Sequence, residues 1–495
     1  MIHVFPSRKD FTENAKTGKL SPVYAECPFS SPQHIYEILE TPFSVLLESK
    51  KGHEKIARYS FIGVEPFLIF KVKNGATEIN VHGKNVLSSS SPLKKLRELM
   101  RSYKIDAGEE LPPFVGGAAG IISYDFVHYF EKLPKSAIDD VHIPDAHFMI
   151  FDTVIAFDHR DEKTYLVSCP AAEEIITGSV AHIEYWDVYY DRAFEKINDH
   201  HEKINRPSPE TLPSRGTSGR GIKIRHEMGK QTYMDIVNRT KEYIRAGDIF
   251  QANLSQRVSA NIGDARPWEL YKVLSHINPA PFAGYLNMGN YFIASSSPER
   301  LVRVSGNIVE TRPIAGTRPR GASEEDDRHM RTELLLNEKE RAEHLMLIDL
   351  ERNDLGRISD YGTVAVDELM ITEDYSHVIH IVSNVKGEIA EGRDCLDAIR
   401  ATFPGGTITG VPKVRCMEII DELEPVVRGP YTGSIGYISF SGDMDLNIII
   451  RTFVIKENIA YVQAGAGIVA DSDPEREYYE TLKKAEALIK TLEVL

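Results

Sequence analysis

Two pairs of glutamates stand three residues apart in segments of helical character: Glu340 and Glu343 in "EKERAEH", and Glu477 and Glu480 in "REYYE". Residues at positions i and i+3 lie on one face of a helix. If the two helices faced each other, four carboxylates would surround one space. Such a space suits Mg²⁺, which binds a few carboxylates together with substrate oxygens and keeps some of its waters. Because the chain has 73 acidic residues, either pair alone is more typical of a solvated helix face.

A second stretch, "FPGGTITGVPK" (residues 403–413), has the composition of an anion-binding loop. Gly405 and Gly410 have the spacing of a Walker A loop, which would continue as Gly-Lys-Ser/Thr. Here two residues come between the last glycine and Lys413, and one of them, Pro412, lacks a backbone donor. This departure argues against a nucleotide phosphate and leaves the identity of the anion open.

The helices that would carry these residues can be placed by their termini. One helix is expected to begin near Ser323, with an acid-rich first turn, and to run through Leu350. The last helix is expected after an N-cap at Asp473, with Pro474 at its first position, where the missing N–H costs nothing. An earlier helix is expected to stop at Gly247.

Strands are expected on both sides of the carboxylate segments. Residues 282–316 and 433–471 contain short β-prone runs separated by tight turns such as "MGN" and "SGD", which predicts antiparallel pairing. Regular alternation of strands and helices is missing, so the predicted fold class is α+β. The stretch from 205 to 221 is rich in Pro, Ser, Gly and Arg. The predicted organisation is an N-terminal region at 1–204, a linker or exposed loop at 205–229, and a catalytic region at 230–495.

The bulk composition excludes several classes of protein. A net charge of -15 argues against a nucleic-acid partner, and means that an anionic substrate needs local basic residues or a metal. We find no apolar run at the start and no stretch of about 18 apolar residues, so we expect neither a secretory signal nor a membrane span. The cysteines form no C-x-x-C pair and predict free thiols in a reducing cytoplasm: Cys27, Cys169, Cys395 and Cys416.

The region from about residue 230 onward resembles the chorismate-utilising enzymes, specifically the large synthase subunits of anthranilate synthase and 4-amino-4-deoxychorismate synthase. The motifs that carry the resemblance are "GDIFQANLSQR" (247–257), "ETRPIAGTRPRG" (310–321), "NEKERAEHLMLIDLERNDLGRIS" (337–359), "YSHVIHIVSNVKGE" (375–388), "FPGGTITGVPKVRCMEIIDELEP" (403–425), "YTGSIGY" (431–437), "IIIRT" (448–452) and "QAGAGIVADSDPEREYYE" (463–480). "LLES" and "RYSFIG" extend it more loosely to the N-terminal region. The resemblance implies two large antiparallel β-sheets packed as a sandwich, with helices outside.

The resemblance implies that the anion is chorismate and that the reaction begins with loss of its C4 hydroxyl. Glu343 and Glu480 would bind Mg²⁺, which holds the ring carboxylate. Glu340 and Glu477, one helical turn earlier, would complete the shell around the metal. One of these two, or His380, would protonate the leaving hydroxyl.

Further contacts are implied around the substrate. Thr407 would form a hydrogen bond near the hydroxyl, and Tyr431 and Arg451 would bind the enolpyruvyl carboxylate, for which the arginine fork is suited. The remaining implied contacts are the backbone N–H groups of Ala466 and Gly467, Gly316 and Thr317 beside the ring, and Lys484 and Lys413 as sources of positive charge.

The nucleophile and its source follow from two residue types. Isochorismate and salicylate synthases have a lysine base where this chain has Gln251, and glutamine cannot deprotonate water, so ammonia is the expected nucleophile. A glutaminase uses a cysteine on a Gly-x-Cys-x-Gly turn, and no cysteine here has that context. We therefore expect a separate glutamine amidotransferase subunit to supply the ammonia.

The position of amination is less well determined. Ala315 in "PIAGT" replaces the lysine nucleophile of the best-known aminodeoxychorismate synthases and favours anthranilate synthase. "FPGGT", "LERND", "SNVKGE" and "TGSIGY" favour the aminodeoxychorismate branch instead, which is the leading prediction by a narrow margin. In either branch L-tryptophan is expected as an allosteric or structural ligand, in contact with Ser49, Pro281, Phe282 and Ala283. A non-catalytic paralogue that binds tryptophan or a glutaminase is the remote alternative, and the four intact carboxylates argue against it.

Overall fold

The computed structural model describes residues 2–50, 56–179, 185–206, 222–321, 323–374 and 378–495. Most of the expected linker, residues 207–221, and the first three residues of the motif at 375–388 lie outside the described residues.

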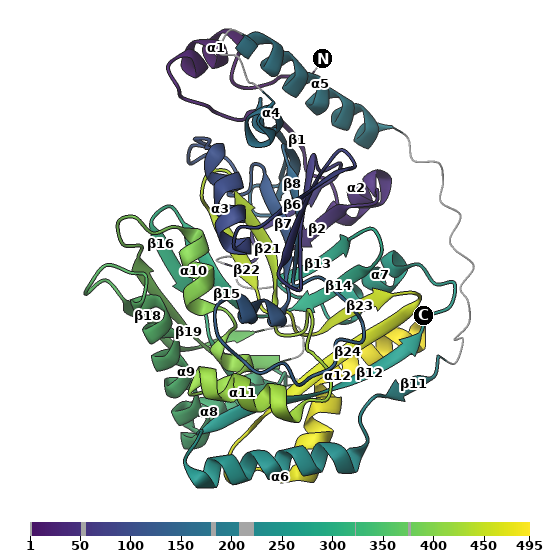
Figure 1. Ribbon diagram of the computed structural model, residues 1–495, viewed down its shortest axis with the longest axis vertical. Coiled ribbons are helices and arrows are strands. Elements are labelled where there is room, and N and C mark those ends of the chain that lie inside the picture. Colours follow the sequence, from purple (N-terminus) through teal and green to yellow (C-terminus); the bar gives the residue numbers. More distant parts are fainter. Residues whose placement is uncertain (1, 51–55, 180–184, 207–221, 322, 375–377) are drawn as a thin grey trace.

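Two large antiparallel sheets, which we call sheet A and sheet B, form the centre of the molecule (Figure 1). Sheet A has the order β1 (Val23–Pro28), β10 (Lys163–Ser168), β9 (Thr153–Asp158), β3 (Tyr59–Gly63), β2 (Ser44–Glu48), β13 (Phe282–Asn287), β14 (Phe292–Ser297), β23 (Thr452–Lys456), β24 (Ile459–Ile468), β12 (Gln251–Asn261) and β11 (Ile224–His226), with β20 (Gly410–Val411) beside β12. Sheet B has the order β17 (Ile314–Pro319), β19 (Val378–Glu388), β16 (Ile308–Thr311), β15 (Arg300–Ser305), β22 (Met444–Asn447), β21 (Ser434–Ser439), β7 (Gly117–Ile122), β8 (Ala146–Phe151), β4 (Leu68–Lys73), β5 (Ala76–Val81) and β6 (Lys84–Ser88), with β18 (Ala365–Asp374) beside β19. The predicted antiparallel hairpins are confirmed, because β13 pairs with β14 and β23 with β24.

The two sheets pack face to face over a shared hydrophobic core. The Phe61 ring of sheet A lies 5.2 Å from the Tyr437 ring of sheet B, at an angle of 64°. Side chains alternate along the strands of sheet A. In β9, Val154 belongs to the core between the sheets, whereas Ile155 belongs to a second core under the helices. The predicted sandwich is therefore confirmed, and sheet A is apolar on both faces.

Helices cover the outside of the sandwich. The second core joins the outer face of sheet A to α1 (Arg8–Lys16), α2 (Pro32–Leu39), α5 (Trp186–Asn205), α7 (Pro267–Ile277) and α12 (Pro474–Val494). The remaining helices are α3 (Pro92–Ser102), α4 (Ala172–Thr177), α6 (Lys230–Ala246), α8 (Glu324–Leu336), α9 (Glu338–Gly356), α10 (Cys395–Thr402) and α11 (Lys413–Leu423), with 3₁₀ turns at Tyr124–Tyr129 and Gly406–Ile408. In Figure 1, α1 and α5 lie at one end of the molecule and α6 at the other. No helix in the described part of the chain is both long and apolar enough to cross a membrane.

The predicted helix termini are confirmed, with one correction. Asp473 caps α12 by accepting from the Arg476 N–H at 2.9 Å, and α6 ends at Gly247, whose φ is +83°. The single helix expected from Ser323 to Leu350 is wrong, because it is two helices that meet at Asn337. The Asn337 side chain accepts from the Glu340 N–H at 3.1 Å. Asn337 therefore acts as a helix N-cap and starts a new helix at the first glutamate pair.

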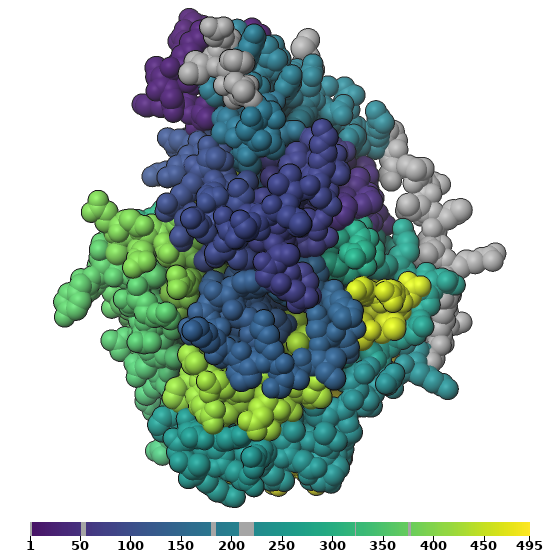
Figure 2. Space-filling model, in the orientation of Figure 1, coloured from purple at the N-terminus to yellow at the C-terminus, as the bar shows by residue number. Residues whose placement is uncertain are grey.

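Strands from the N-terminal and catalytic regions share both sheets. In sheet A, β2 pairs with β13, and in sheet B, β7 pairs with β21. Figure 2 shows the blue segment around residues 100–150 lying against the yellow-green segment around residues 400–450, and Ile138 forms a backbone bridge with Val426 there. The two regions are thus interleaved in space. Within the expected linker, β11 extends sheet A at its edge.

Candidate functional site

The glycine-rich end of β24 lies against the start of β12, where the backbones approach closely. Gly467 pairs with Asn253, and a Cβ on Gly467 would lie 2.5 Å from the Gln251 Nε2. A Cβ on Gly465 would lie 2.8 Å from the Tyr431 hydroxyl and would also collide with the Asn253 side chain. The side-chain oxygens of Gln251 and Asn253 are both buried without a hydrogen-bond partner in the described structure. Such unsatisfied atoms are rare in native proteins and indicate a place where a ligand or water binds.

Gly465→Ala is expected to lower kcat/KM for the substrate by roughly 10²-fold, because the added methyl must displace Tyr431 or separate β24 from β12. The measurement is steady-state kinetics together with a thermal unfolding scan. Gly356→Ala is the matched control, since no atom lies within 4 Å of the Cβ it would add. Unchanged kinetics in Gly465→Ala would remove Tyr431 from the site.

Arg451 lies beside Tyr431, directly before β23, with a φ of +53°. Among the described residues its guanidinium has no hydrogen bond and no ion pair, and burial lowers its pKa. A partly buried cation without a counter-ion is costly. The arrangement therefore indicates an anion site, as the sequence predicts for this arginine.

The four glutamates have partners within the protein. The Glu340 Oε1 accepts from Arg318 at 2.7 Å, and its Oε2 is buried without a partner among the residues that the structure describes. The Glu343 Oε1 accepts from the Gln251 amide at 3.3 Å, and Glu480 pairs with Lys484 at 2.9 Å. Burial raises the pKa of Glu477, and the charge of Glu480 raises it further.

This donor set fits a hard divalent cation. Within the described ranges, no three His, Cys, Asp or Glu side chains lie close enough together to hold a metal ion. However, Glu340 has an unsatisfied buried oxygen, and Glu477 and Glu480 repel each other. Carboxylate oxygens are the ligands that Mg²⁺ prefers, and a cation would offset both features. Glu343 and Glu480 stay the predicted ligands.

The two lysines predicted as sources of positive charge, Lys484 and Lys413, have different partners. The Lys484 Nζ donates to the Gly465 carbonyl at 3.0 Å, which places its charge at the glycine-rich segment. Lys413 instead pairs with the buried Asp354 at 2.5 Å. The positive charge of Lys413 is thus compensated inside the protein.

His380 faces the bulge of β17 that contains Gly316. Its Nδ1 lies 3.0 Å from the Gly316 carbonyl and 3.0 Å from the Thr317 hydroxyl. Since a carbonyl can only accept, Nδ1 carries a proton, and in the neutral ring Nε2 is the acceptor nitrogen. Burial lowers the pKa of His380, and the charge of Arg451 adds to the shift. His380 is therefore neutral near pH 7 and is placed to orient a group.

Thr407 contacts the buried carboxyl of Glu299, a residue that the sequence did not predict for the site. The Thr407 hydroxyl donates to the Glu299 Oε1 at 2.8 Å. Burial raises the pKa of Glu299 to about 7. A carboxyl that keeps its proton near neutral pH is suited to general acid catalysis. Glu299 follows Ser297 and Pro298 at the end of a strand, and no charge pattern marks it in the sequence.

The two branch-deciding residues lie on strands of different sheets. Gln251 begins β12 and contacts Glu343, as described above. Ala315 lies on β17 opposite Ile381 of β19, next to the bulge.

The four residues predicted for tryptophan meet at a large cavity between the sheets. The Ser49 hydroxyl donates to the Pro281 carbonyl at 2.8 Å. Ser49, Pro281, Phe282 and Ala283 all line a cavity of about 890 Å³. A space of this size accommodates an amino acid with a large ring.

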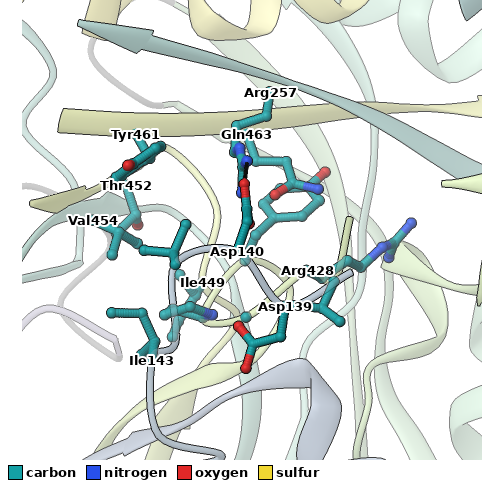
Figure 3. Close-up of a pocket in the computed structure, with 15 residues that line it drawn as sticks. Asp139, Asp140, Ile143, Arg257, Arg428, Ile449, Thr452, Val454, Tyr461 and Gln463 are labelled. Atoms are coloured by element: carbon teal, nitrogen blue, oxygen red, sulfur yellow. Dashed lines mark hydrogen bonds and ion pairs between the residues drawn. The ribbon is translucent and has the colours of Figure 1, made fainter. Parts of the chain in front are cut away.

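A second, much smaller cavity lies beside Tyr431 (Figure 3). Its volume of about 40 Å³ holds about two or three waters. Arg257 and Asp140 meet across it, with the Arg257 Nη1 3.1 Å from the Asp140 Oδ1. It is too small for a substituted ring.

Comparisons with known proteins agree with this geometry. A family model described as chorismate binding enzyme matches residues 42–490. The chain is 42% identical to "Anthranilate synthase component 1" of Acetivibrio thermocellus over 99% of this chain and 98% of that one. It is 43% identical to "Aminodeoxychorismate synthase component 1" of Bacillus subtilis over 91% of this chain and 92% of that one. The solved structure of anthranilate synthase component I from Streptococcus pneumoniae matches with a TM-score of 0.77 and 36% identity, over 87% of this chain and 92% of that one.

Proposed function

We propose that this chain, which belongs to the family of chorismate binding enzymes, aminates chorismate with ammonia in a Mg²⁺-dependent reaction. The observation that carries the proposal is Arg451, a partly buried guanidinium with no hydrogen bond or ion pair to any residue that the structure describes. Chorismate is a dicarboxylate, and one carboxylate would supply the missing counter-ion. The glutamate pairs support binding of the other carboxylate through a metal.

We assign the residues of the site separate roles in substrate binding, proton donation and metal binding. Arg451 and Tyr431 bind the enolpyruvyl carboxylate, while Lys484 adds positive charge at the glycine-rich segment. Glu299, oriented by Thr407, donates its proton to the C4 hydroxyl, which leaves as water. When bound by Glu343 and Glu480, Mg²⁺ would hold the ring carboxylate and withdraw electron density from the ring.

We propose a separate glutamine amidotransferase subunit as the source of ammonia. Relatives are named component 1, which implies a second component. Burial raises the pKa of Cys395 and of Cys416 to about 12. Because the thiolate is the nucleophile, these cysteines are unsuited to glutamine hydrolysis.

Two products have specific support. Ala315 cannot form a covalent adduct at C2, which favours direct attack of ammonia at C2 and hence anthranilate. The sequence motifs that resemble the aminodeoxychorismate branch, together with the relative from Bacillus subtilis, favour attack at C4. The 890 Å³ cavity supports L-tryptophan as a ligand in either case.

The product assay uses the purified chain with chorismate, Mg²⁺ and a high concentration of ammonium at mildly alkaline pH, with and without an added aminodeoxychorismate lyase. Anthranilate formed without the lyase would establish attack at C2. 4-Aminobenzoate that appears only with the lyase would establish attack at C4. If chorismate were not consumed, amination would be excluded, and the remote alternative of a non-catalytic binding protein would replace it.

A further inference from the structure

A second side chain lies with Tyr431 over the glycine-rich end of β24: the amide of Asn253. The Tyr431 hydroxyl lies 2.8 Å from the position of a Cβ on Gly465, and the Asn253 Oδ1 lies closer still to the same position. Asn253 reaches this place from β12, where its backbone is opposite Gly467. Because the two glycines have no side chains, the Asn253 amide has room to lie across β24 beside Tyr431.

Among the described residues, this end of β24 has no strand beside it on the side away from β12. The ladder between β23 and β24 stops at the pair of Phe453 and Val462, before the glycine-rich segment begins. Arg451 comes directly before β23, at the end where this ladder stops. A ligand at this open edge would meet the charge of Arg451, the hydroxyl of Tyr431 and the amide of Asn253.

Contacts of its backbone hold Asn253 in place. Its N–H donates to the Thr409 carbonyl at 2.8 Å, and its carbonyl accepts from the Arg428 Nη2 at 2.7 Å. Arg428 is itself buried and paired with Glu424 at 2.8 Å. The side chain of Asn253 is therefore not needed to fix its strand, and it can bind a ligand with little loss of conformational freedom.

The amide of Asn253 has no hydrogen-bond partner in the described part of the chain. Its Oδ1 is buried without one, and its Nδ2 donates to no described residue. The two ends of an amide have the same shape, so a half-turn puts the Nδ2 donor where Oδ1 lies. A carboxylate only accepts hydrogen bonds, and here it would meet donors from Asn253 and Tyr431 beside the charge of Arg451.

We propose that Asn253 is a further substrate-binding residue, whose amide nitrogen donates to the enolpyruvyl carboxylate of chorismate beside Tyr431 and Arg451. This inference rests on the proposed function. A neutral donor suits the position, because Arg451 already supplies the positive charge that balances this carboxylate. An acidic residue in its place would repel the substrate.

The test is the KM for chorismate, measured at saturating ammonium and Mg²⁺. Asn253→Asp keeps the shape of the side chain but sets a carboxylate against that of the substrate, and it should raise this KM by roughly 10²- to 10³-fold. Asn253→Ala removes the donor and should raise it roughly 10-fold or more, as expected for a hydrogen bond to a charged group. The KM for ammonium should not change, and the unfolding temperature should not fall, because the amide has no hydrogen bond to a described residue.

Asn261→Asp and Asn261→Ala are the matched controls. Asn261 lies at the exposed far end of the same strand, an even number of positions from Asn253 and so on the same face. Both controls should keep the KM values of the parent. An unchanged KM for chorismate in Asn253→Asp would overturn the inference. Equal losses in the two Asn253 variants with a lower unfolding temperature would also overturn it, since that pattern indicates a structural role.

If Asn253→Asp did not fold, an unchanged KM for chorismate in Asn253→Ala would overturn the inference equally. Binding without turnover separates it from the proposed function. The rise in unfolding temperature with added chorismate, in Mg²⁺ but without ammonium, measures binding to the parent and to each variant.

A parent that shows this rise but forms no aminated product would refute the proposed function, and loss of the rise in Asn253→Asp would still support the inference. A parent that aminates chorismate while Asn253→Asp keeps the full rise would refute the inference alone. A parent that neither binds nor consumes chorismate would overturn both.

Discussion

Arg451→Met is expected to lower kcat/KM for chorismate by roughly 10²- to 10³-fold while leaving the protein as stable as before, or more stable. The loss of activity corresponds to about 3–4 kcal/mol, which lies within the usual cost of removing one partner of a buried ionic contact. Stability should not fall, because Arg451 has no partner among the described residues and its charge is already unfavourable where it lies. The measurement is steady-state kinetics combined with urea unfolding.

Arg428→Met is the matched control for this prediction. Arg428 is also buried, but it pairs with Glu424 at 2.8 Å and donates to the Ile408 carbonyl. Its removal leaves the buried Glu424 carboxylate without its cation and is expected to destabilise the fold by about 3–5 kcal/mol. If Arg451→Met lost as much stability as Arg428→Met, Arg451 would be a structural residue and the anion site would be refuted. Arg451→Lys should recover part of the activity, since it keeps the charge without the fork.

Glu343→Gln and Glu480→Gln form the second prediction with a large effect. Each should raise the Mg²⁺ concentration needed for half-maximal activity, and the double variant should be inactive with its fold retained. Loss of a group that only orients a metal ligand costs roughly 10–100-fold in affinity, so loss of a ligand should cost at least that. Glutamine keeps the size of the side chain while removing the charge.

A Mg²⁺ titration of activity measures this effect, and the rise in unfolding temperature with Mg²⁺ measures it without turnover. Glu338→Gln is the control, as it removes an exposed charge from the first turn of α9. A double variant that keeps the Mg²⁺-dependent rise of the parent would place the metal elsewhere.

The sequence predicts the local features of the fold because caps and turns have short-range causes. Asp473 with Pro474 begins α12, and Gly247 ends α6, as expected from their backbone preferences. The end of α8 and the start of α9 at Asn337 were not predicted, because the sequence has helical periodicity on both sides of Asn337. The cap becomes evident only when the Asn337 side chain is seen accepting from Glu340.

The residues of the candidate site that belong to sequence motifs could be predicted. A residue whose pKa depends on its burial in the folded protein could not. Arg451, Thr407 and the glutamate pairs all come from such motifs. Glu299 is one of many acidic residues, and nothing in its neighbours along the chain distinguishes it. Its properties come from the exclusion of water and from Thr407, which is distant in sequence.

The pairing of β2 with β13 and of β7 with β21 has a consequence for how the protein is made. When the ribosome has produced β2, the nearby β3 can pair with one of its edges, but β13, the partner of its other edge, is still more than 230 residues away. The distance along the chain from β7 to β21 is longer still. Contacts between such distant segments are slow to form, because the entropy of closing a long loop must be overcome first. The N-terminal strands therefore leave the ribosome with unpaired edges and apolar faces, and they need protection from aggregation until the last quarter of the chain has been synthesised.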